Sequence, residues 1–226
     1  MNLKHVFFDL DHTLWDFERN SAKTFKHIFQ LNNIGADISE FLKRYESINF
    51  EYWRLYRVDK VTKEALRYGR LKDSFDAINY TISDQMIDKL SEDYITFLAA
   101  YNHVFEGTFE LLDYLKPKYQ LHIITNGFEE VQNRKIENSN MTSYFNQIIT
   151  SEQVGVKKPN PRVFEYALQK ANAKPEESIM IGDSFEADIQ GAMNCGIDAI
   201  FFNEQKKKVE EEIKSVTSLL DIKKYL

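Results

Sequence analysis

The sequence has few of the features that mark a secreted or membrane protein. Its single cysteine, Cys195, has no partner for an internal disulfide and so suits a reducing compartment. The longest apolar runs, such as Ile197 to Phe202, are far shorter than the ~20 residues that a membrane-spanning helix requires. The chain also opens directly on the strand-like Val6-Phe7-Phe8, without the basic start and apolar stretch of a signal peptide. We therefore expect a cytoplasmic protein with no membrane segment.

An excess of basic charge is also missing. The 226 residues include 29 Lys and Arg against 35 Asp and Glu, which gives a formal net charge of −6 with both signs interspersed. No basic face of the kind that neutralises nucleic-acid phosphates is evident, so a nucleic-acid partner is not expected. Hydrophobic residues at 43% and charged residues at 28% are ordinary proportions for a globular chain. The length suits one core domain, alone or with an insert.

Short β-rich runs point to an α/β fold. Each run is almost continuously apolar, as in strands that are buried on both faces, and helical patterns lie between the later runs. The four clear runs are His5 to Leu10, Leu121 to Asn126, Ile179 to Asp183 and Ala199 to Phe202, and a weaker fifth is Gln147 to Thr150. The pattern predicts a Rossmann-like parallel sheet that is built from β-α units.

A long helical insert follows the first strand. Between Thr13 and Leu121 no convincing strand is present, and helical periodicity continues instead. A loop of that length is not expected inside a compact domain, so the segment indicates a separate helical domain. We place this domain at residues 16–96 and the α/β core at residues 1–15 and 97–226. Most aromatics of the insert are expected to form its own small core, including Phe50, Tyr52, Trp53, Tyr56 and Tyr68.

The first candidate site residues follow the first strand, in the segment Asp9-Leu10-Asp11-His12-Thr13. Side chains of an extended chain repeat every second residue, so Asp9 and Asp11 are expected to point the same way at the carboxyl edge of the sheet. Open α/β sheets bind ligands at that edge. Two carboxylates so close together call for a cation, and hard oxygen ligands suit Mg²⁺. A turn or helix cap would use the same residue types, so the segment alone leaves both interpretations open.

Three later segments place polar side chains at comparable points. Thr125 and Asn126 end a buried strand and could cradle a phosphate through neutral donors, although such residues are usually just turns. Lys158 precedes a helix start and could neutralise phosphate oxygens, although a solvated lysine is the commoner case. Asp183 ends another buried strand and would supply a further carboxylate near the ion. Asp188, five residues on, could orient Lys158 or a metal-bound water, with helix capping by Asp183 as the simpler alternative.

Together these four segments resemble the ordered motifs of the haloacid dehalogenase superfamily, which read DxDxT, then Thr or Ser, then Lys, then GDxxxxD. The resemblance covers essentially the whole chain and implies a hydrolase whose helical insert is a cap over the active site. It implies that Asp9 is the nucleophile, and that Asp11 is the general acid and base and binds Mg²⁺ through its backbone carbonyl. By the same resemblance, the metal ligands are Asp9, Asp11 and Asp183, and the phosphoryl group is held by Thr125, Asn126 and the catalytic Lys158.

Finer features of the motifs distinguish among the reactions that members of the superfamily catalyse. Members of the superfamily that cleave carbon–halogen bonds lack an acid at the position of Asp11, so phosphate chemistry through an aspartyl-phosphate is expected here. The Lys-Thr-Gly run and membrane helices of the transporting ATPases are missing. The segments Ile124 to Phe128 and Ser151 to Pro161 are similar to bacterial 5'-nucleotidases that hydrolyse pyrimidine and non-standard nucleoside monophosphates. The Gly69-Arg70 pair of the insert is similar to the same branch, without implying a role for Arg70.

Two alternatives remain open. A phosphatase for sugar phosphates, or for another small ester such as phosphoglycolate, would use the same motifs. A regulatory module that keeps the fold without turnover would be expected to lose Asp9 or Asp11, and both are present. The expected partner is a small phosphate ester, most simply a nucleoside monophosphate, with Mg²⁺ as the cofactor. The preferred base and the oligomeric state do not follow from the sequence.

Overall fold

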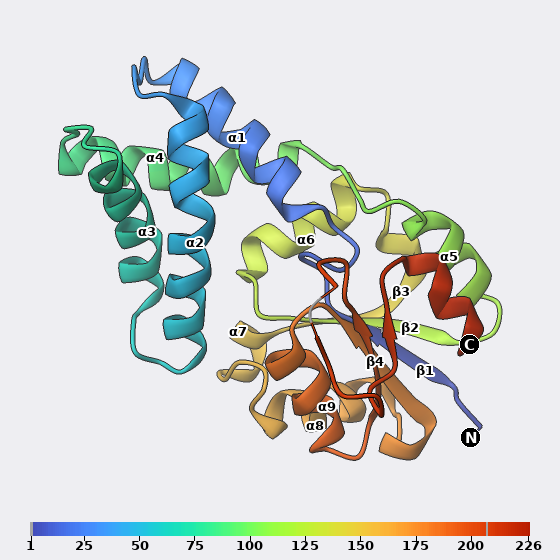
Figure 1. Cartoon of the computed structure of the whole chain (residues 1–226). Coiled ribbons are helices and arrows are strands. Elements are labelled where there is room, and N and C mark those ends of the chain that lie inside the picture. The colour runs from blue at the N-terminus through green and yellow to red at the C-terminus, as the bar shows by residue number, and fades with distance from the viewer. Residues whose placement is uncertain (1, 207) are drawn as a thin grey trace. The chain divides into compact units, whose positions relative to one another are not determined.

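The computed structural model describes residues 2–206 and 208–226. In this part of the chain, six strands form one parallel sheet in the order β3-β2-β1-β4-β5-β6 (Figure 1). Their bounds are β1 His5–Phe8, β2 Gln120–Thr125, β3 Phe145–Thr150, β4 Ser178–Gly182, β5 Asp198–Phe202 and β6 Ser215–Val216. The predicted α/β fold is confirmed, and the weaker run at Gln147 to Thr150 lies within β3.

The centre of the sheet is fully buried. β1 lies between β2 and β4, where Phe8 pairs with Ile123 on one side and Ile181 on the other. Every residue of β1 and β4 is buried, as their continuous apolar runs predict. Because the strands are parallel, their carboxyl ends meet at the same edge of the sheet. The polar residues that follow β1, β2 and β4 are thereby brought together.

The helices of the α/β unit alternate with its strands. Their bounds are α5 Thr108–Leu115, α6 Glu129–Asn138, α7 Ser151–Val154, α8 Pro161–Ala171 and α9 Gly191–Met193, with a π-helix at Phe185–Gln190 and 3₁₀ helices at Thr142–Tyr144, Pro175–Glu177 and Leu219–Lys224. A further 3₁₀ helix, Leu98–Ala100, belongs to the helical unit Glu18–Tyr101. The start of α8 is as expected, because the Asn160 side chain accepts a hydrogen bond from the Arg162 N–H at 3.0 Å and Pro161 is its first residue. The apolar face of α8 packs against β1, β2, β3 and β4.

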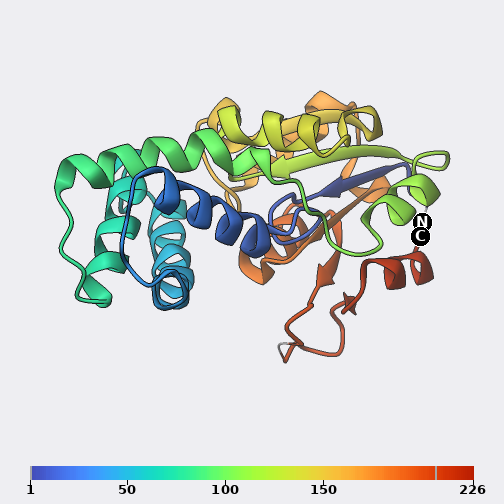
Figure 2. The ribbon, with the colours of Figure 1, turned by 90° about the horizontal axis from the view of Figure 1, so that it is seen from above.

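The segment Glu18–Tyr101 forms a second compact unit, and the α/β unit takes in the chain up to Phe17 and from Asn102 onward. The helices of this helical unit are α1 Phe17–Leu31, α2 Ile38–Arg57, α3 Lys63–Ala77 and α4 Asp84–Phe97, coloured blue to green in Figure 2. Asp37, Thr62 and Ser83 cap α2, α3 and α4 by accepting hydrogen bonds from first-turn N–H groups. The identity of this unit as a cap domain stays a prediction. None of the described helices is both long and apolar enough to cross a membrane.

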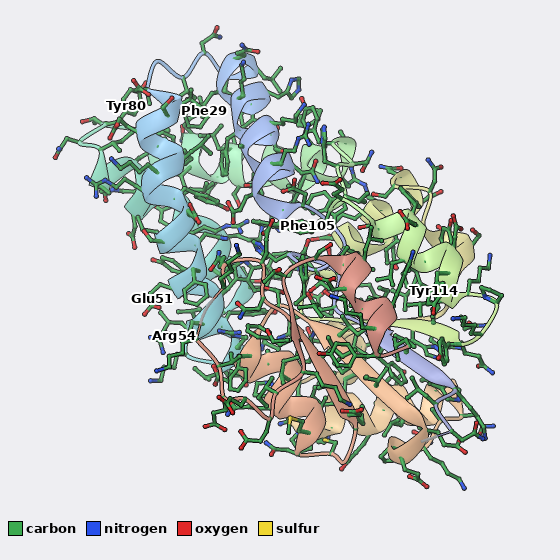
Figure 3. The ribbon with its side chains drawn as sticks, turned by 45° about the vertical axis from the view of Figure 1, so that its right-hand side comes forward. Phe29, Glu51, Arg54, Tyr80, Phe105 and Tyr114 are labelled. Carbon is green, nitrogen blue, oxygen red and sulfur yellow. The ribbon has the colours of Figure 1, made fainter. Side chains whose placement is uncertain are left out.

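Aromatic rings form the core of the helical unit. Phe25, Phe41 and Phe75 are fully buried, and the ring centroid of Phe41 lies 5.0 Å from that of Phe25 and 4.7 Å from that of Phe75. The Phe75 ring also contacts Phe29 and Tyr80, which lie at the same end of the unit (Figure 3). Offset and edge-to-face rings at these distances stabilise a core beyond the area that they bury.

Most of the aromatics expected in this core lie outside it. The buried positions of α2 are Phe41, Tyr45, Asn49 and Tyr56. Phe50 falls off this stripe and is 62% exposed, while Tyr52, Trp53 and Tyr68 are only half-buried. Glu51 and Arg54, which form an ion pair at 2.7 Å on the same exposed side of α2, mark the solvent face (Figure 3). The prediction was therefore right for Tyr56 and wrong for Phe50.

Candidate active site

Asp9 lies directly after β1, at the carboxyl edge of the sheet. Its backbone N–H donates to the Ile181 carbonyl of β4 at 2.9 Å, so the chain stays paired with its neighbour through this residue. Asp9 is only 8% exposed, and its Oδ1 lies 2.7 Å from Nζ of Lys158. The edge at which α/β sheets bind ligands therefore presents a nearly buried carboxylate beside an ammonium group.

Lys158 joins three parts of the α/β unit. It is 1% exposed, and its Nζ donates to Asp9 Oδ1 at 2.7 Å, Asp188 Oδ1 at 2.6 Å and the Ile124 carbonyl at 2.6 Å. An ammonium group has three hydrogens, so these acceptors use all of them. Burial acts against the charged form, but the carboxylates of Asp188 and Asp9 outweigh it and raise the pKa of Lys158. Lys158 therefore carries a fixed positive charge beside Asp9.

Three carboxylates surround this position. Ligand oxygens of Asp9, Asp183 and Asp188 all lie within 4.8 Å of one another. Burial raises the pKa of Asp183 to about 7, and the Asp188 charge adds to the effect. Burial likewise raises the pKa of Asp9, against the opposing effect of Lys158. One ammonium group against three carboxylates leaves an excess of negative charge, and an all-oxygen donor set of this kind fits Mg²⁺.

The chain turns back sharply after Asp11. The backbone N–H groups of Leu14 and Trp15 both donate to the Leu10 carbonyl, at 3.0 and 2.9 Å. His12 adopts a left-handed φ of 63°. The extended alternation that the sequence analysis assumed therefore does not continue from His12 to Thr13.

The Asp11 carboxylate contacts two side chains of α6. Its Oδ1 accepts a hydrogen bond from Lys135 Nζ at 2.6 Å, and its Oδ2 accepts one from Gln132 Nε2 at 2.8 Å. The expectation that the Asp9 and Asp11 side chains point the same way stays a prediction. Among the described side chains, Asp188 rather than Asp11 completes the acidic group. The contact between Mg²⁺ and the backbone carbonyl of Asp11 stays a prediction.

Thr125 and Asn126, at the end of β2, both have protein partners. Thr125 Oγ1 accepts hydrogen bonds from the Gly127 N–H at 3.1 Å and from Gln132 Nε2 at 2.7 Å. The Asn126 side chain accepts from the Lys158 N–H at 2.8 Å and donates to the Lys158 carbonyl at 3.0 Å. Asn126 therefore holds the loop that delivers Lys158. The phosphate contacts expected of Thr125 and Asn126 stay predictions.

The sequence analysis missed Gln132 and Lys135. They lie three residues apart on α6 and so share one face of the helix. Gln132 is 0% exposed and Lys135 is 2% exposed, beside the apolar Val131 and Ile136. The one signal that could have found them is a glutamine and a lysine on the buried face of an amphipathic helix.

Arg70 has partners within the helical unit. It is 2% exposed, donates to Asn49 Oδ1 at 2.9 Å and lies 4.9 Å from the ring centroid of Tyr94. Gly69 lies against Tyr52, because a Cβ built on Gly69 would come within 2.3 Å of the Tyr52 hydroxyl. The Gly69-Arg70 pair thus serves close packing in this unit.

The match to a known protein family includes both the strand-end motifs and the helical unit. Residues 6–202 match the model of the haloacid dehalogenase-like hydrolases. The chain belongs to this family. The prediction of a hydrolase of the haloacid dehalogenase superfamily is therefore confirmed.

Several proteins resemble this haloacid dehalogenase-like hydrolase over nearly their whole length. Pyrimidine 5'-nucleotidase YjjG from Escherichia coli is 30% identical over 98% of this chain and 96% of its own. Glyceraldehyde 3-phosphate phosphatase from Methanothermobacter thermautotrophicus is 31% identical over 93% of this chain and 90% of its own. The crystal structure of the HAD-hydrolase YfnB from Bacillus subtilis, bound to magnesium, has a TM-score of 0.90 at 26% identity and covers 100% of this chain and 99% of YfnB.

Proposed function

We propose that this hydrolase is a Mg²⁺-dependent phosphatase of nucleoside 5'-monophosphates, with pyrimidine or non-standard bases, that forms an aspartyl-phosphate on Asp9. The main support is the pair of contacts from Lys158 to Asp9 and Asp188. They hold a fixed positive charge against Asp9, the proposed nucleophile, within the acidic group that fits Mg²⁺. Phosphoryl transfer gains mostly from positioning and charge neutralisation, which is what this arrangement supplies.

In the first step, a carboxylate oxygen of Asp9 attacks phosphorus and the bond from phosphorus to the leaving oxygen breaks. Asp11 gives its proton to that oxygen, which departs as the hydroxyl of the nucleoside. Asp11 then takes a proton from a water molecule whose oxygen attacks phosphorus. The bond from phosphorus to Asp9 breaks, inorganic phosphate is released, and both aspartates return to their starting state.

The remaining residues support these steps by charge and by position. Lys158 neutralises Asp9 and the phosphoryl oxygens, and Asp188 holds Lys158 in place at 2.6 Å. Thr125 and the N–H groups of its loop would donate to the phosphoryl group. Asp9, Asp183 and the Asp11 carbonyl would hold Mg²⁺, which when bound supplies further neutralisation of the phosphoryl oxygens.

The choice of a nucleotide rests on resemblance. YjjG aligns with almost the whole of this chain, and the segments around Thr125 and Lys158 are similar to the same nucleotidase branch. A phosphatase for sugar phosphates is the second candidate, because the glyceraldehyde 3-phosphate phosphatase is equally similar in identity. A module without turnover is disfavoured because Asp9 and Lys158 are present and paired at 2.7 Å.

Phosphate release from a panel of substrates tests this proposal. The panel holds pyrimidine and purine nucleoside monophosphates, sugar phosphates and phosphoglycolate, each with Mg²⁺ and again with a chelator. We expect Mg²⁺-dependent release with the highest kcat/KM for pyrimidine or non-standard nucleotides. A preference for sugar phosphates would keep the chemistry and overturn the substrate. No release from any ester would overturn the function as a whole.

The nucleophile is tested separately by Asp9→Asn. We expect turnover to be nearly abolished in a folded protein, while the exposed Asp113→Asn in the same unit leaves it unchanged. Borohydride reduction of the wild-type protein during turnover should convert the acyl phosphate of Asp9 to a homoserine that peptide mass spectrometry detects. Reduction at any other aspartate would assign the intermediate elsewhere.

A further inference from the structure

Two side chains of α6 hold both oxygens of the Asp11 carboxylate. Lys135 Nζ lies 2.6 Å from Oδ1, and Gln132 Nε2 lies 2.8 Å from Oδ2. The side chains of Lys135 and Asp11 are 3% and 20% exposed. The carboxylate is therefore reachable from solvent while its partners lie beneath it.

The ammonium group of Lys135 is fixed by its surroundings as well as by Asp11. Its Nζ lies 4.3 Å from the ring centroid of Trp15 and 5.3 Å from that of Phe17, and both rings are buried. Aromatic faces attract a cation, and a buried ammonium group is costly unless it has such partners. The Trp15 carbonyl accepts a hydrogen bond from the His12 N–H at 3.0 Å. The turn that carries Asp11 thus also builds the surface on which Lys135 rests.

Gln132 joins Asp11 to the end of β2. Its Nε2 also donates to Thr125 Oγ1 at 2.7 Å, so both amide hydrogens are used. Its Oε1 is buried without a protein partner among the described residues. Exchanging the amide oxygen and nitrogen would set an oxygen against the Asp11 carboxylate, so the orientation is determined by Asp11. A Cβ on Gly127 would come within 2.2 Å of Nε2, and only glycine at that position admits Gln132.

We propose that Lys135 and Gln132 are positioning residues that hold the Asp11 carboxylate in the orientation from which it exchanges a proton with the leaving oxygen and the attacking water. This inference rests on the proposed phosphatase function. A carboxylate has about four acceptor sites, so the two contacts leave a free site on each oxygen. Without them the carboxylate rotates, and the share of the rate that general acid catalysis supplies is lost, on the order of 10²-fold or more.

The test compares leaving groups in the full-length protein with Mg²⁺. A nucleoside leaves as a strongly basic alkoxide unless it is protonated, whereas a nitrophenolate leaves without a proton. Rapid-quench kinetics of the first turnover measure the rate at which the leaving group departs, separately from the later hydrolysis of the aspartyl-phosphate. The variants are Lys135→Met and Gln132→Leu. The matched control is Lys170→Met, an exposed lysine of α8 whose Nζ lies 5.3 Å from the Tyr166 ring centroid.

We expect Lys135→Met and Gln132→Leu to slow the first turnover of a nucleoside monophosphate by on the order of 10²-fold, with KM within about twofold. The first turnover of nitrophenyl phosphate should change by less than about threefold, and Lys170→Met should change neither. Equal loss on both substrates would show that the variants disturb Asp9 or the fold, and would overturn the proposal. So would no loss on either substrate. A wild-type protein that releases phosphate from neither substrate would instead refute the phosphatase function.

A measurement without turnover covers the case in which the variants do not fold. An ammonium group shielded from water exchanges its protons slowly and gives a ¹H–¹⁵N signal. The lysine ammonium spectrum of the protein without Mg²⁺ should contain such a signal for Lys135, and Asp11→Asn should shift or abolish it. A Lys135 signal that Asp11→Asn leaves unchanged would overturn the contact on which the proposal depends.

Discussion

Gly182 lies against the carboxylate of Asp188, so closely that a Cβ on Gly182 would come within 2.3 Å of Asp188 Oδ2. The other oxygen of Asp188 accepts the hydrogen bond from Lys158 at 2.6 Å, and Oδ2 accepts one from the Ser184 N–H at 3.0 Å. Glycine at the end of β4 is thus the condition for Asp188 to reach Lys158.

Replacing Gly182 by alanine should therefore displace Asp188 and leave Lys158 short of one carboxylate. We expect the free energy of unfolding to fall by about 1–3 kcal/mol, as for overpacking in a core, and kcat to fall at least about tenfold. Urea denaturation and steady-state kinetics measure the two effects. Gly35→Ala is the control, because its Cβ would meet only the Tyr80 hydroxyl at 3.8 Å. A Gly182→Ala protein as stable and active as the control would contradict the packing argument.

Magnesium should stabilise the folded protein through its proposed ligands Asp9 and Asp183, which lie in one acidic group with Asp188. A ligand at about 100 times its Kd adds about 2.7 kcal/mol to the free energy of unfolding, which raises the melting temperature by several degrees. Thermal unfolding with and without Mg²⁺ measures this gain. Asp183→Asn should lose most of it, and Asp113→Asn should keep it. An equal gain in both variants would place the ion elsewhere.

A histidine pair should make the α/β unit sensitive to acid. His5 Nδ1 and His122 Nε2 lie 3.1 Å apart in the sheet, and burial, with a smaller effect of His5, lowers the pKa of His122 from 6.5 to about 4. Between pH 6.5 and pH 4, His122 is protonated in the unfolded chain and stays neutral in the folded protein. The stability present above pH 6.5 is therefore lost as pH falls towards 4, by up to roughly 3 kcal/mol.

Chemical denaturation of the wild type and of His122→Leu between pH 7 and 4 measures this loss. The wild type should lose more stability than the variant over that interval. The raised pKa values of Asp9 and Asp183 act in the opposite direction, but they are common to both proteins and cancel in the comparison. Parallel pH dependences would show that His122 is not the group responsible.

In the helical unit, Gly69 and Tyr52 should be coupled. Gly69→Ala sets a Cβ 2.3 Å from the Tyr52 hydroxyl, which itself donates to Asp73 at 2.8 Å. We expect a loss of about 1 kcal/mol in stability. In a Tyr52→Ala background the same change should stabilise α3 by up to about 1 kcal/mol, because alanine is the better helix former. A double-mutant cycle measures the coupling, and additive effects would argue against it.

Several site residues could be found from sequence because strand ends are local features. A buried parallel strand is a short apolar run, and a polar residue that ends it must lie at the carboxyl edge of the sheet. Asp9, Thr125 and Asp183 all follow this rule. The turn after Asp11 was not predicted, in which His12 is left-handed and the N–H groups of Leu14 and Trp15 donate to the Leu10 carbonyl. No residue type in this short segment requires that turn.

The hydrogen-bond partners of the site residues could not be predicted from neighbouring residues in the sequence. Gln132 and Lys135 lie 121 and 124 residues after Asp11, and Lys158 lies 149 residues after Asp9. The two-residue β6 carries too few apolar positions to register as a strand. The aromatic core of the helical unit likewise depends on which face of each helix is covered, so that Phe41 is buried and Phe50 is exposed.

The order of apolar runs was enough to predict the α/β class, since periodicity is a property of neighbouring residues. The polar motifs at the strand ends carried the resemblance to the hydrolase family. Only the tertiary structure decided which carboxylates the ammonium groups of Lys158 and Lys135 contact. The strand order β2-β1-β4 brings Lys158 between Asp9 and Asp188, and the packing of α6 brings Lys135 to Asp11. Such contacts join residues that only the packed sheet brings within hydrogen-bonding distance.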